Sequence, residues 1–331
     1  MSTIGIIANP ASGKDIRRLV SHATVIDNNE KVNIIERIIL GSQKFGVDKI
    51  YIMPDSFVMG YKVKEKLMLT DELQVDIEIL DMKIKASPKD TEKAAEILEE
   101  LGVGCVVVIG GDGTNRLAAK HLKTVPLIGV STGTNNAYPE MLEGTVVGMA
   151  AAAVASGRFS FEQSCYRDKI IEIYRNDEFE DIALIDAVIS DEIYVGAKAI
   201  WDMKHIKHIV VSKCHPASIG FSTLVGAIRR IDDLDDFGGS LRINGGGRKF
   251  YAPVAAGTIV EVSTDELEIV EVDKPFRWKA DFKGIIAVDG EREVRFHQGD
   301  VITFRITRKG PIHVNVKKAL EVAQSGGFFL A

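Results

Sequence analysis

The first half of the chain alternates between short apolar runs and segments whose apolar positions have helical spacing. The apolar runs predict strands, and they fall at residues 3–8, 49–53, 75–80, 105–109 and 125–130. Runs this continuously apolar are typical of strands buried on both faces, as in a parallel sheet covered by helices. The repeated alternation therefore favours an open, doubly wound α/β domain with a mostly parallel sheet.

The segments between these runs carry helical patterns. A helix is expected over about 115–123, and the alanine-rich stretch 148–157 predicts a closely packed one. The best-marked helix follows Ser87, which can cap its N-terminus, with Pro88 in the first turn and Asp90 completing a capping box.

From about residue 168 the pattern changes to hairpins. Short β runs with recurring turn residues follow, interrupted by a mixed helical stretch over 195–231, and they favour an antiparallel sheet or sandwich. We therefore expect an α/β nucleotide-binding domain over 1–165 and a β-rich, sandwich-like substrate domain with inserted helices over 166–316. The segment 317–331 can form a last helix that returns to the first domain.

The clearest chemical signal is CVVVIGGDGTNRLAA at 105–119, where a strand runs into GGDGT and then directly into a helix. Such a turn places backbone N–H groups and the positive end of a helix at one point, which suits a phosphate. Gly110, Gly111 and Gly113 are expected to allow unusual backbone torsions and a close approach to a ligand. The alternative is an ordinary tight turn, but such a turn does not need three glycines around one acid.

Asp112 lies at the centre of this loop. A carboxylate repels phosphates unless it binds Mg²⁺ or takes a proton from an attacking hydroxyl. Both roles belong to phosphoryl transfer, so Asp112 is a candidate catalytic base and a candidate metal ligand. A P-loop of the pattern GxxxxGK[ST] is excluded, because Ala8 stands at its first glycine and Asp15 at its Ser/Thr position. The dinucleotide-binding pattern GxGxxG is also absent after the first strand.

Two further polar loops, NPASGK (9–14) and STGTNNAYPE (131–140), follow equivalent strand ends. In a doubly wound sheet such loops can meet along one edge, where these folds bind ligands. Each loop alone is also an ordinary Asn/Gly/Ser turn. Together they offer groups for ribose, the adenine edge and phosphate, and the candidate cofactor contacts in them are Asn9, Pro10, Ser12, Thr132, Gly133, Thr134, Asn135 and Asn136.

Composition and charge narrow the classes of function. The net charge is −6, and no Lys/Arg run resembles a nucleic-acid or polybasic membrane patch. The apolar runs are too short to span a bilayer, and the N-terminus lacks the features of a signal peptide. The three cysteines are far apart, which favours a reducing compartment. We expect a cytoplasmic protein with no nucleic-acid or membrane partner.

Taken with DGERE in the β-rich half, the motifs NPASGK, GGDGT and STGTNNAYPE resemble those of the ATP–NAD kinase and diacylglycerol/sphingoid lipid kinase superfamily. Within it, the sequence is most similar to the branch known as acetoin catabolism protein X, over nearly the whole chain. The resemblance implies an α/β nucleotide domain followed by a β-sandwich domain, with the active site in the cleft between them. It also implies ATP and Mg²⁺ as cofactors and a small-molecule acceptor.

The resemblance assigns roles to individual residues. Asn9 matches the asparagine of the first nucleotide loop. The family's phosphate loop corresponds to Gly110, Gly111, Asp112, Gly113 and Thr114, and the GTxN element of lipid kinases corresponds to Gly133, Thr134 and Asn136.

The late DGE element, which the second domain contributes to the site in this superfamily, corresponds to Asp289, Gly290 and Glu291. The resemblance makes Glu291 a second catalytic candidate and Asp289 a cofactor contact. By local pattern alone, Asp289-Gly290 is instead a strong hairpin signal between two β runs.

The sequence departs from the family patterns on the acceptor side. Lipid kinases continue GTxN with an aspartate where this chain has Ala137, and NAD kinases carry Asn-Glu in the region of residues 135–137. The Thr-Gly-Ser-Thr-Ala-Tyr element of NAD kinases has only a poor counterpart at 217–226. These departures bear on the phosphoryl acceptor more than on the nucleotide.

We therefore predict an ATP-dependent kinase that phosphorylates a nucleotide-like hydroxyl, with NAD the leading acceptor, NADP the product, and a homodimer as the assembly. Two alternatives stay open. A lipid kinase of the diacylglycerol type needs an apolar groove and membrane attraction, and neither is visible in the sequence. A nucleotide-binding accessory protein of acetoin catabolism, with weak or no catalysis, is compatible with the departures at 135–137.

Overall fold

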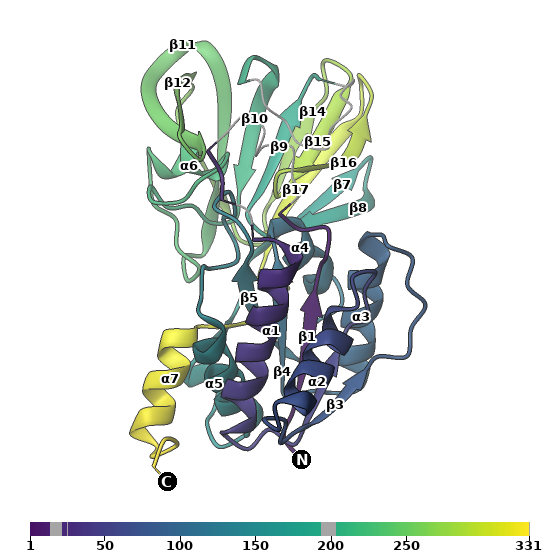
Figure 1. Ribbon diagram of the computed structural model, residues 1–331. Helices are drawn as coiled ribbons and strands as arrows, with labels where there is room; N and C mark the ends of the chain where they lie inside the picture. Colours follow the sequence, from purple (N-terminus) through teal and green to yellow (C-terminus); the bar gives the residue numbers. More distant parts are fainter. Residues whose placement is uncertain (14–21, 25, 193–202, 331) are drawn as a thin grey trace.

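The computed structural model describes residues 1–13, 22–24, 26–192 and 203–330. It stacks two layered bodies end to end, the first with helices on both faces of a sheet and the second built mainly of strands (Figure 1). This arrangement confirms the predicted fold class.

The first sheet has the strand order β3-β2-β1-β4-β5-β18-β6. The five strands predicted from the apolar runs are all present and mutually parallel, at β1 (Thr3–Ala8), β2 (Lys49–Ile52), β3 (Asp76–Ile79), β4 (Cys105–Gly110) and β5 (Pro126–Ser131). Every residue of β4 and β5 is buried, because helices cover both faces. The order of these five strands reverses between β1 and β4, which is the switch point of a doubly wound sheet.

One face of this sheet is covered by α1 (Asn28–Gln43), α2 (Met59–Leu69) and α5 (Gly144–Ala155), and the other by α3 (Pro88–Glu100) and α4 (Asp112–Ala119). The alanine-rich helix packs as closely as predicted, since a Cβ on Gly148 would lie 2.3 Å from the Ile38 carbonyl oxygen of α1. Helix α2 was not predicted from the sequence.

The second body is a sandwich of two antiparallel sheets that enclose an apolar core. One sheet has the order β12-β11-β10-β9-β15-β16 with β13 paired to β11, and the other has the order β14-β17-β7-β8. The strands are β7 (Ile170–Arg175), β8 (Glu178–Ala183), β9 (Asp186–Ser190), β10 (Ile206–Val211), β11 (Phe237–Ala255), β12 (Thr258–Thr264), β13 (Glu268–Glu271), β14 (Pro275–Lys279), β15 (Gly284–Val288), β16 (Glu291–Phe296) and β17 (Val301–Thr307).

The helical stretch predicted over 195–231 is wrong where the structure describes it. Its apolar run forms β10, because β-branched side chains suit a buried strand between β9 and β11. Helix is limited there to the short α6 (Ser222–Gly226) and the 3₁₀ turn η3 (Met203–His205), and residues 195–202 lie outside the described part.

The chain crosses between the two bodies twice. The short turn η2 (Phe161–Gln163) leads into β6 (Cys165–Arg167), which pairs with β18 (Ile312–Val314), and β18 runs parallel to β5. The last helix, α7 (Val316–Ser325), packs beside α5 in the first body (Figure 1). The return therefore begins at β18, ahead of residue 317. None of the described helices is long and apolar enough to cross a membrane.

Candidate active site

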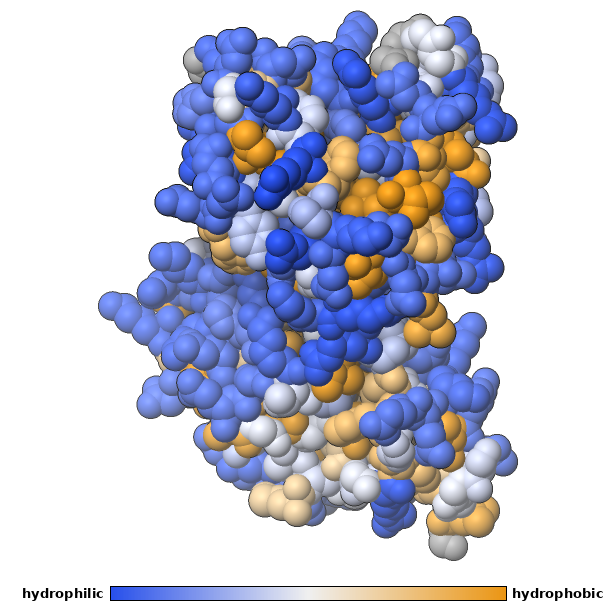
Figure 2. Space-filling view, turned by 180° about the vertical axis from the view of Figure 1, so that it is seen from behind, coloured by the Kyte–Doolittle hydropathy of each residue, from blue (hydrophilic) through white to orange (hydrophobic). Residues whose placement is uncertain are grey.

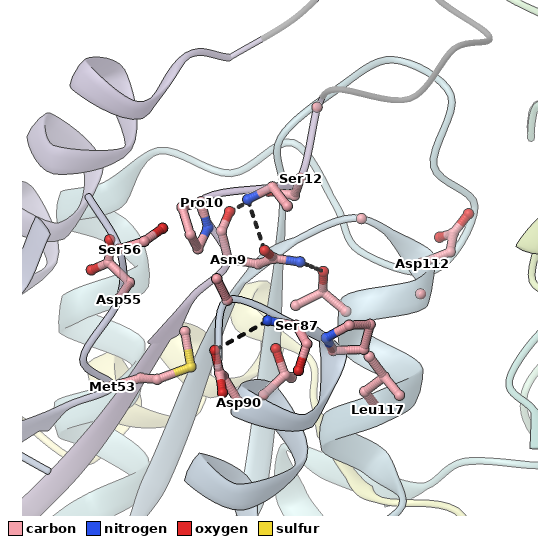
Figure 3. A pocket seen from close by; sticks show the side chains of 18 of the residues that line it. Asn9, Pro10, Ser12, Met53, Asp55, Ser56, Ser87, Asp90, Asp112 and Leu117 are labelled. Carbon is pink, nitrogen blue, oxygen red and sulfur yellow. Dashed lines mark hydrogen bonds between the residues drawn. The ribbon is translucent and has the colours of Figure 1, made fainter. Parts of the chain in front are cut away.

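A cavity of about 620 Å³ opens at the carboxyl ends of β1, β2 and β4, where the first body meets the turn between β15 and β16 (Figure 3). Its walls also include the N-terminal ends of α3 and α4. The cavity therefore lies beside the switch point between β1 and β4, the position at which doubly wound sheets bind ligands.

The loop after β1 forms one wall and is held by its own asparagine. The Asn9 side chain accepts the Ala11 N–H (2.8 Å) and donates to the Thr114 hydroxyl of α4 (2.9 Å). Fully buried Lys31 of α1 donates to the backbone oxygens of Asn9 (2.9 Å) and Ser12 (2.8 Å). Lys31 was not predicted from the sequence, because a lysine in an amphipathic helix usually marks its solvated face.

The GGDGT loop leads directly into α4. This helix begins at Asp112 with Gly111 as its N-cap, earlier than the predicted start near 115. Its first turn therefore lines the cavity through Asp112, Gly113 and Thr114. The unpaired N–H groups and positive partial charge of a helix N-terminus suit an anion at this wall.

The three glycines of this loop are explained by close approach and not by torsion. None of them has a positive φ, so the expectation of unusual backbone torsions is wrong. At each position an added Cβ would lie 2.8 Å or less from a neighbouring side chain, which belongs to Thr114 at Gly110, to Asn136 at Gly111 and to Glu291 at Gly113. The loop is bare because its own Thr114 and two other segments, at Asn136 and Glu291, press against it.

Asp112 lines the cavity, and its carboxylate is held by the loop after β5. Its Oδ1 accepts the N–H groups of Ala137 (2.9 Å) and Tyr138 (2.8 Å), and its Oδ2 lies 3.1 Å from the Ala137 nitrogen. At the position where lipid kinases carry an aspartate, this chain thus uses the backbone of Ala137 to fix the acid.

The loop after β5 contributes one predicted residue to the cavity wall. Asn136 lines the cavity and donates to the Ser131 hydroxyl (2.8 Å). Five predicted cofactor contacts are not among the described residues that line this cavity: Gly110, Thr132, Gly133, Thr134 and Asn135.

Four of these residues instead make contacts within or between loops. Thr132 donates to the Ser12 hydroxyl, and the Gly133 carbonyl accepts from the Ser131 hydroxyl. Thr134 accepts from the Thr24 N–H, and Asn135 accepts from the Ala256 N–H of the second body.

The second body reaches the cavity through the Asp289-Gly290 turn. These residues have φ values of +49° and +80°, and β15 and β16 pair directly across them at Val288 and Glu291. This is the two-residue hairpin turn that favours Asp-Gly. The hairpin signal was therefore correct, and Asp289, Gly290 and Glu291 also line the cavity.

The Asp289 side chain holds this turn in place. Its carboxylate accepts the N–H groups of Leu184 (2.8 Å), Ile185 (2.7 Å) and Asp186 (3.2 Å). Burial raises the pKa of Asp289 to about 6, although nearby Arg116 and the three N–H donors favour its charged form. A contact between Asp289 and a bound cofactor stays a prediction.

Arg116 ties α4 to the second body. Its fully buried guanidinium lies 2.8 Å from Asp181, 3.8 Å from Asp289 and 3.9 Å from Glu291. Asp181 also pairs with Lys120 of α4 at 2.7 Å. The sequence pattern did not single out Arg116, because its nearest partner lies 65 positions away in another domain.

The cavity extends past the predicted loops to the segment after β2 and to the start of α3 (Figure 3). Asp55 follows β2 and accepts the Phe57 N–H (2.7 Å), and Asp90 in the first turn of α3 accepts the Lys85 N–H (2.9 Å). Their position at the carboxyl edge of the sheet was the available signal. The described wall includes the acidic residues Asp55, Asp90, Asp112, Asp289 and Glu291, although the side chain of Asp289 is itself fully buried. A polyphosphate bound here would need positive charge from the helix N-terminus and from a cation.

Comparison with known proteins matches the two parts of the chain to two family models. Residues 4–159 match the family model for the ATP-NAD kinase N-terminal domain, and residues 169–309 match that for the Acetoin catabolism protein X C-terminal domain. Acetoin catabolism protein X of Cupriavidus necator (strain H16) is 34% identical over 332 residues, covering 97% of this chain and 90% of that protein.

A solved structure with the same fold is that of yeast NADH kinase complexed with NADH. It superposes with a TM-score of 0.53 and 12% sequence identity, covering 100% of this chain and 89% of that one. At that identity the likeness concerns the kinase-like fold alone.

Proposed function

Because the chain belongs to the family of acetoin catabolism protein X, we propose that it is a kinase that transfers phosphate from ATP to a hydroxyl of a nucleotide-like acceptor, with NAD the leading candidate. The observation that carries this proposal is the meeting of three strand-end loops and a turn of the second body around one cavity. That cavity has a helix N-terminus and the Asp112 carboxylate in its wall.

In this proposal the ATP phosphates lie against the first turn of α4, and the free N–H groups of this helix N-terminus bind them. The Asn9–Thr114 bond keeps the loop after β1 beside that turn. Most of the rate enhancement would come from positioning and from charge stabilisation of the transferred phosphoryl group.

The carboxylates of the wall fit a magnesium ion that arrives with the nucleotide. Magnesium usually takes one or two protein carboxylates together with substrate phosphates and keeps several waters. Asp112 and Glu291 would hold it, and its charge would neutralise that of the phosphates. In the described part of the chain, no group of three or more His, Cys, Asp or Glu side chains forms a ready-made metal site.

In the transfer step, the acceptor hydroxyl oxygen forms a bond to the γ-phosphorus and the bond from that phosphorus to the β–γ bridging oxygen breaks, which releases ADP. The hydroxyl proton passes to Asp112 and then to solvent. For NAD the reacting group would be the adenosine 2′-hydroxyl and the product NADP.

The test is a turnover screen with Mg·ATP against NAD, NADH and nucleosides, with ADP and the phosphorylated product measured by chromatography. We expect stoichiometric ADP and NADP with NAD, and none with the Asp112→Asn variant. If the wild-type protein binds ATP but yields no phosphorylated product with any acceptor, the proposed activity is wrong. Sedimentation analysis of the same preparation checks the predicted homodimer.

One observation favours the accessory alternative, a protein that binds a nucleotide without turnover. Both oxygens of Asp112 already accept backbone N–H groups. One of the donors is Ala137, which lies in the region 135–137 where this chain departs from the acceptor-side motifs of the kinase families. ATP binding by calorimetry, together with no product in the screen, would support this second function.

The lipid kinase alternative has its own observation. Figure 2 shows apolar residues gathered on the second body, on the face opposite to that of Figure 1. Co-sedimentation with liposomes that contain diacylglycerol, followed by a search for phosphorylated lipid, separates this alternative from the first.

A further inference from the structure

We propose that Tyr138, which does not line the cavity, is the positioning residue for Asp112. Tyr138 ties the backbone that holds this carboxylate to a buried polar cluster at the junction of the two bodies. The proposal rests on the role given to Asp112 in the proposed function.

Tyr138 is hydrogen-bonded both through its backbone and through its side chain. Its backbone N–H donates to Oδ1 of Asp112 (2.8 Å), and its side-chain hydroxyl donates to Oδ2 of Asp168 (2.6 Å). Its ring is 3% exposed and packs in the apolar core that joins the first sheet to β7 and β8. The side chain is therefore fixed at its far end and by its ring.

The group that receives the hydroxyl is a set of four residues, Tyr138, Asp168, Lys213 and His313, which we call the junction cluster. Asp168 lies where the chain first crosses between the bodies, and His313 lies on β18, where it returns. The His313 Nδ1 is 3.1 Å from both the Tyr138 hydroxyl and Asp168 Oδ2, and the Lys213 ammonium is 3.7 Å from Asp168 Oδ1. The cluster thus joins both bodies to the loop that holds Asp112.

The charges of this cluster keep the tyrosine bond strong. Burial alone would raise the pKa of Asp168, but Lys213 and His313 outweigh it and the pKa is lowered, so the carboxylate stays charged. Burial and the Asp168 charge raise the pKa of Tyr138 well above its usual value, so its hydroxyl stays a donor. A hydrogen bond from a hydroxyl to a charged carboxylate is stronger than one between two neutral groups.

This bond can matter for transfer because the acid must stand within a fraction of an ångström of its working position. A misplacement of about 1 Å can lower a rate by about 100-fold. If the hydroxyl anchor is lost, the backbone at Ala137 and Tyr138 gains freedom, and with it the carboxylate of Asp112.

The test compares Tyr138→Phe with Tyr166→Phe. Tyr166 is a matched control because its ring stacks on the same His313 at 5.2 Å, while its hydroxyl donates to Asp233 at 3.3 Å. The first readout is the amide ¹H–¹⁵N spectrum of residues 137 and 138, whose protons are shifted by the bond to Asp112. The second is the separation of kcat from KM for ATP.

We expect Tyr138→Phe to move both amide resonances toward their positions in Asp112→Asn, and Tyr166→Phe to leave them in place. In a working kinase the kcat of Tyr138→Phe should fall by about 10-fold to 100-fold, with KM for ATP nearly unchanged. Unmoved amides in a folded Tyr138→Phe protein would overturn the proposal, and so would equal shifts in the control.

The amide readout does not depend on turnover. If no acceptor is phosphorylated but the amides move in Tyr138→Phe alone, the positioning role stands and the proposed function fails. Should Tyr138→Phe not fold, Asp168→Asn supplies the second variant. It keeps the shape of the acceptor and should move the same two amides in the same direction by a smaller amount, and unmoved amides there overturn the proposal.

Discussion

The GGDGT loop and the Asp289-Gly290 turn face the same cavity from different bodies, and each contains a buried aspartate bound by backbone N–H groups. Asp112 is held by the loop after β5, at the start of a helix. Asp289 is held by the segment between β8 and β9, in a turn with positive φ. The two carboxylates have similar donors but opposite settings: one stands beside the positive end of a helix, and the other keeps a hairpin in place.

This contrast teaches that hydrogen bonds to a carboxylate do not identify its task. What separates the two acids is what would move if each were lost. Removal of the Asp112 carboxylate would take this acceptor from the N–H groups of Ala137 and Tyr138. Removal of the Asp289 carboxylate would take the acceptor from three N–H groups that hold a turn with positive φ, and would remove one of the three carboxylates beside Arg116.

The largest effect is expected from Asp112→Asn. An amide keeps the shape of the side chain but cannot accept the proton of the acceptor hydroxyl, so transfer should fall by about 100-fold or more. Nucleotide binding by calorimetry should change little. Single-turnover transfer near the wild-type level would remove Asp112 from the mechanism, and an equal loss in a folded Asp289→Asn protein would abolish the distinction between the two acids.

Asp289→Ala should destabilise the fold by about 3 kcal/mol, because buried N–H donors would lose their acceptor. Urea unfolding measures this loss. Asp177→Ala is the matched control, since Asp177 also has a positive φ (+66°) in a hairpin turn but is exposed. The control should lose only the cost of alanine in that conformation, about 1 kcal/mol. Equal losses in the two variants would contradict the role given to the Asp289 carboxylate.

The raised pKa of Asp289 predicts a stability change with pH. Its pKa of about 6 in the fold exceeds the ordinary value, so its contribution to stability is greatest in acid and falls as the pH rises through 6. The difference in unfolding free energy between wild type and Asp289→Asn should therefore be larger at pH 5 than at pH 7, by about 1 kcal/mol. A difference that grows toward pH 7 would reverse the sign of the assigned shift.

The smallest effect is expected from Gly113→Ala. The new Cβ would meet the carboxylate of Glu291, the flexible end of a side chain, so the fold should change in stability by less than about 1 kcal/mol. Transfer should fall modestly, by less than about tenfold, as Glu291 is pushed from the loop. The control is Glu291→Ala. If this variant leaves turnover unchanged, or if adding Gly113→Ala to it lowers turnover further, then Gly113→Ala does not act by displacing Glu291.

The sequence predicted the first body well because its signals are local. Apolar runs marked β1 to β5, and the capping sequence around Ser87 marked the start of α3. The region 195–231 was misread because whether an apolar run becomes a helix or a strand there depends on β9 and β11 as neighbours, and those neighbours are distant in sequence.

The residues of the candidate site and those that support it divide in the same way. Residues in loops with a motif, such as Asn9, Asp112 and Glu291, were named in advance and line one cavity. Lys31, Arg116 and Tyr138 were missed because each acts through partners that only the folded chain brings near. Their types carry no signal of their own, since a buried lysine, arginine or tyrosine is marked by its partners and not by its neighbours in sequence.

The pairing of β18 with β5, and the packing of α7 beside α5, have a consequence for how the protein is made. The first body draws Val314, Ala319, Ala323 and Phe328 into its own core, although these residues follow the whole second body in the sequence. A nascent chain cannot complete the first body until β18 and α7 have left the ribosome, so the usual order, in which the leading domain finishes before the next one is made, cannot hold here. Limited proteolysis of stalled chains should find the leading half cleavable until β18 and α7 emerge.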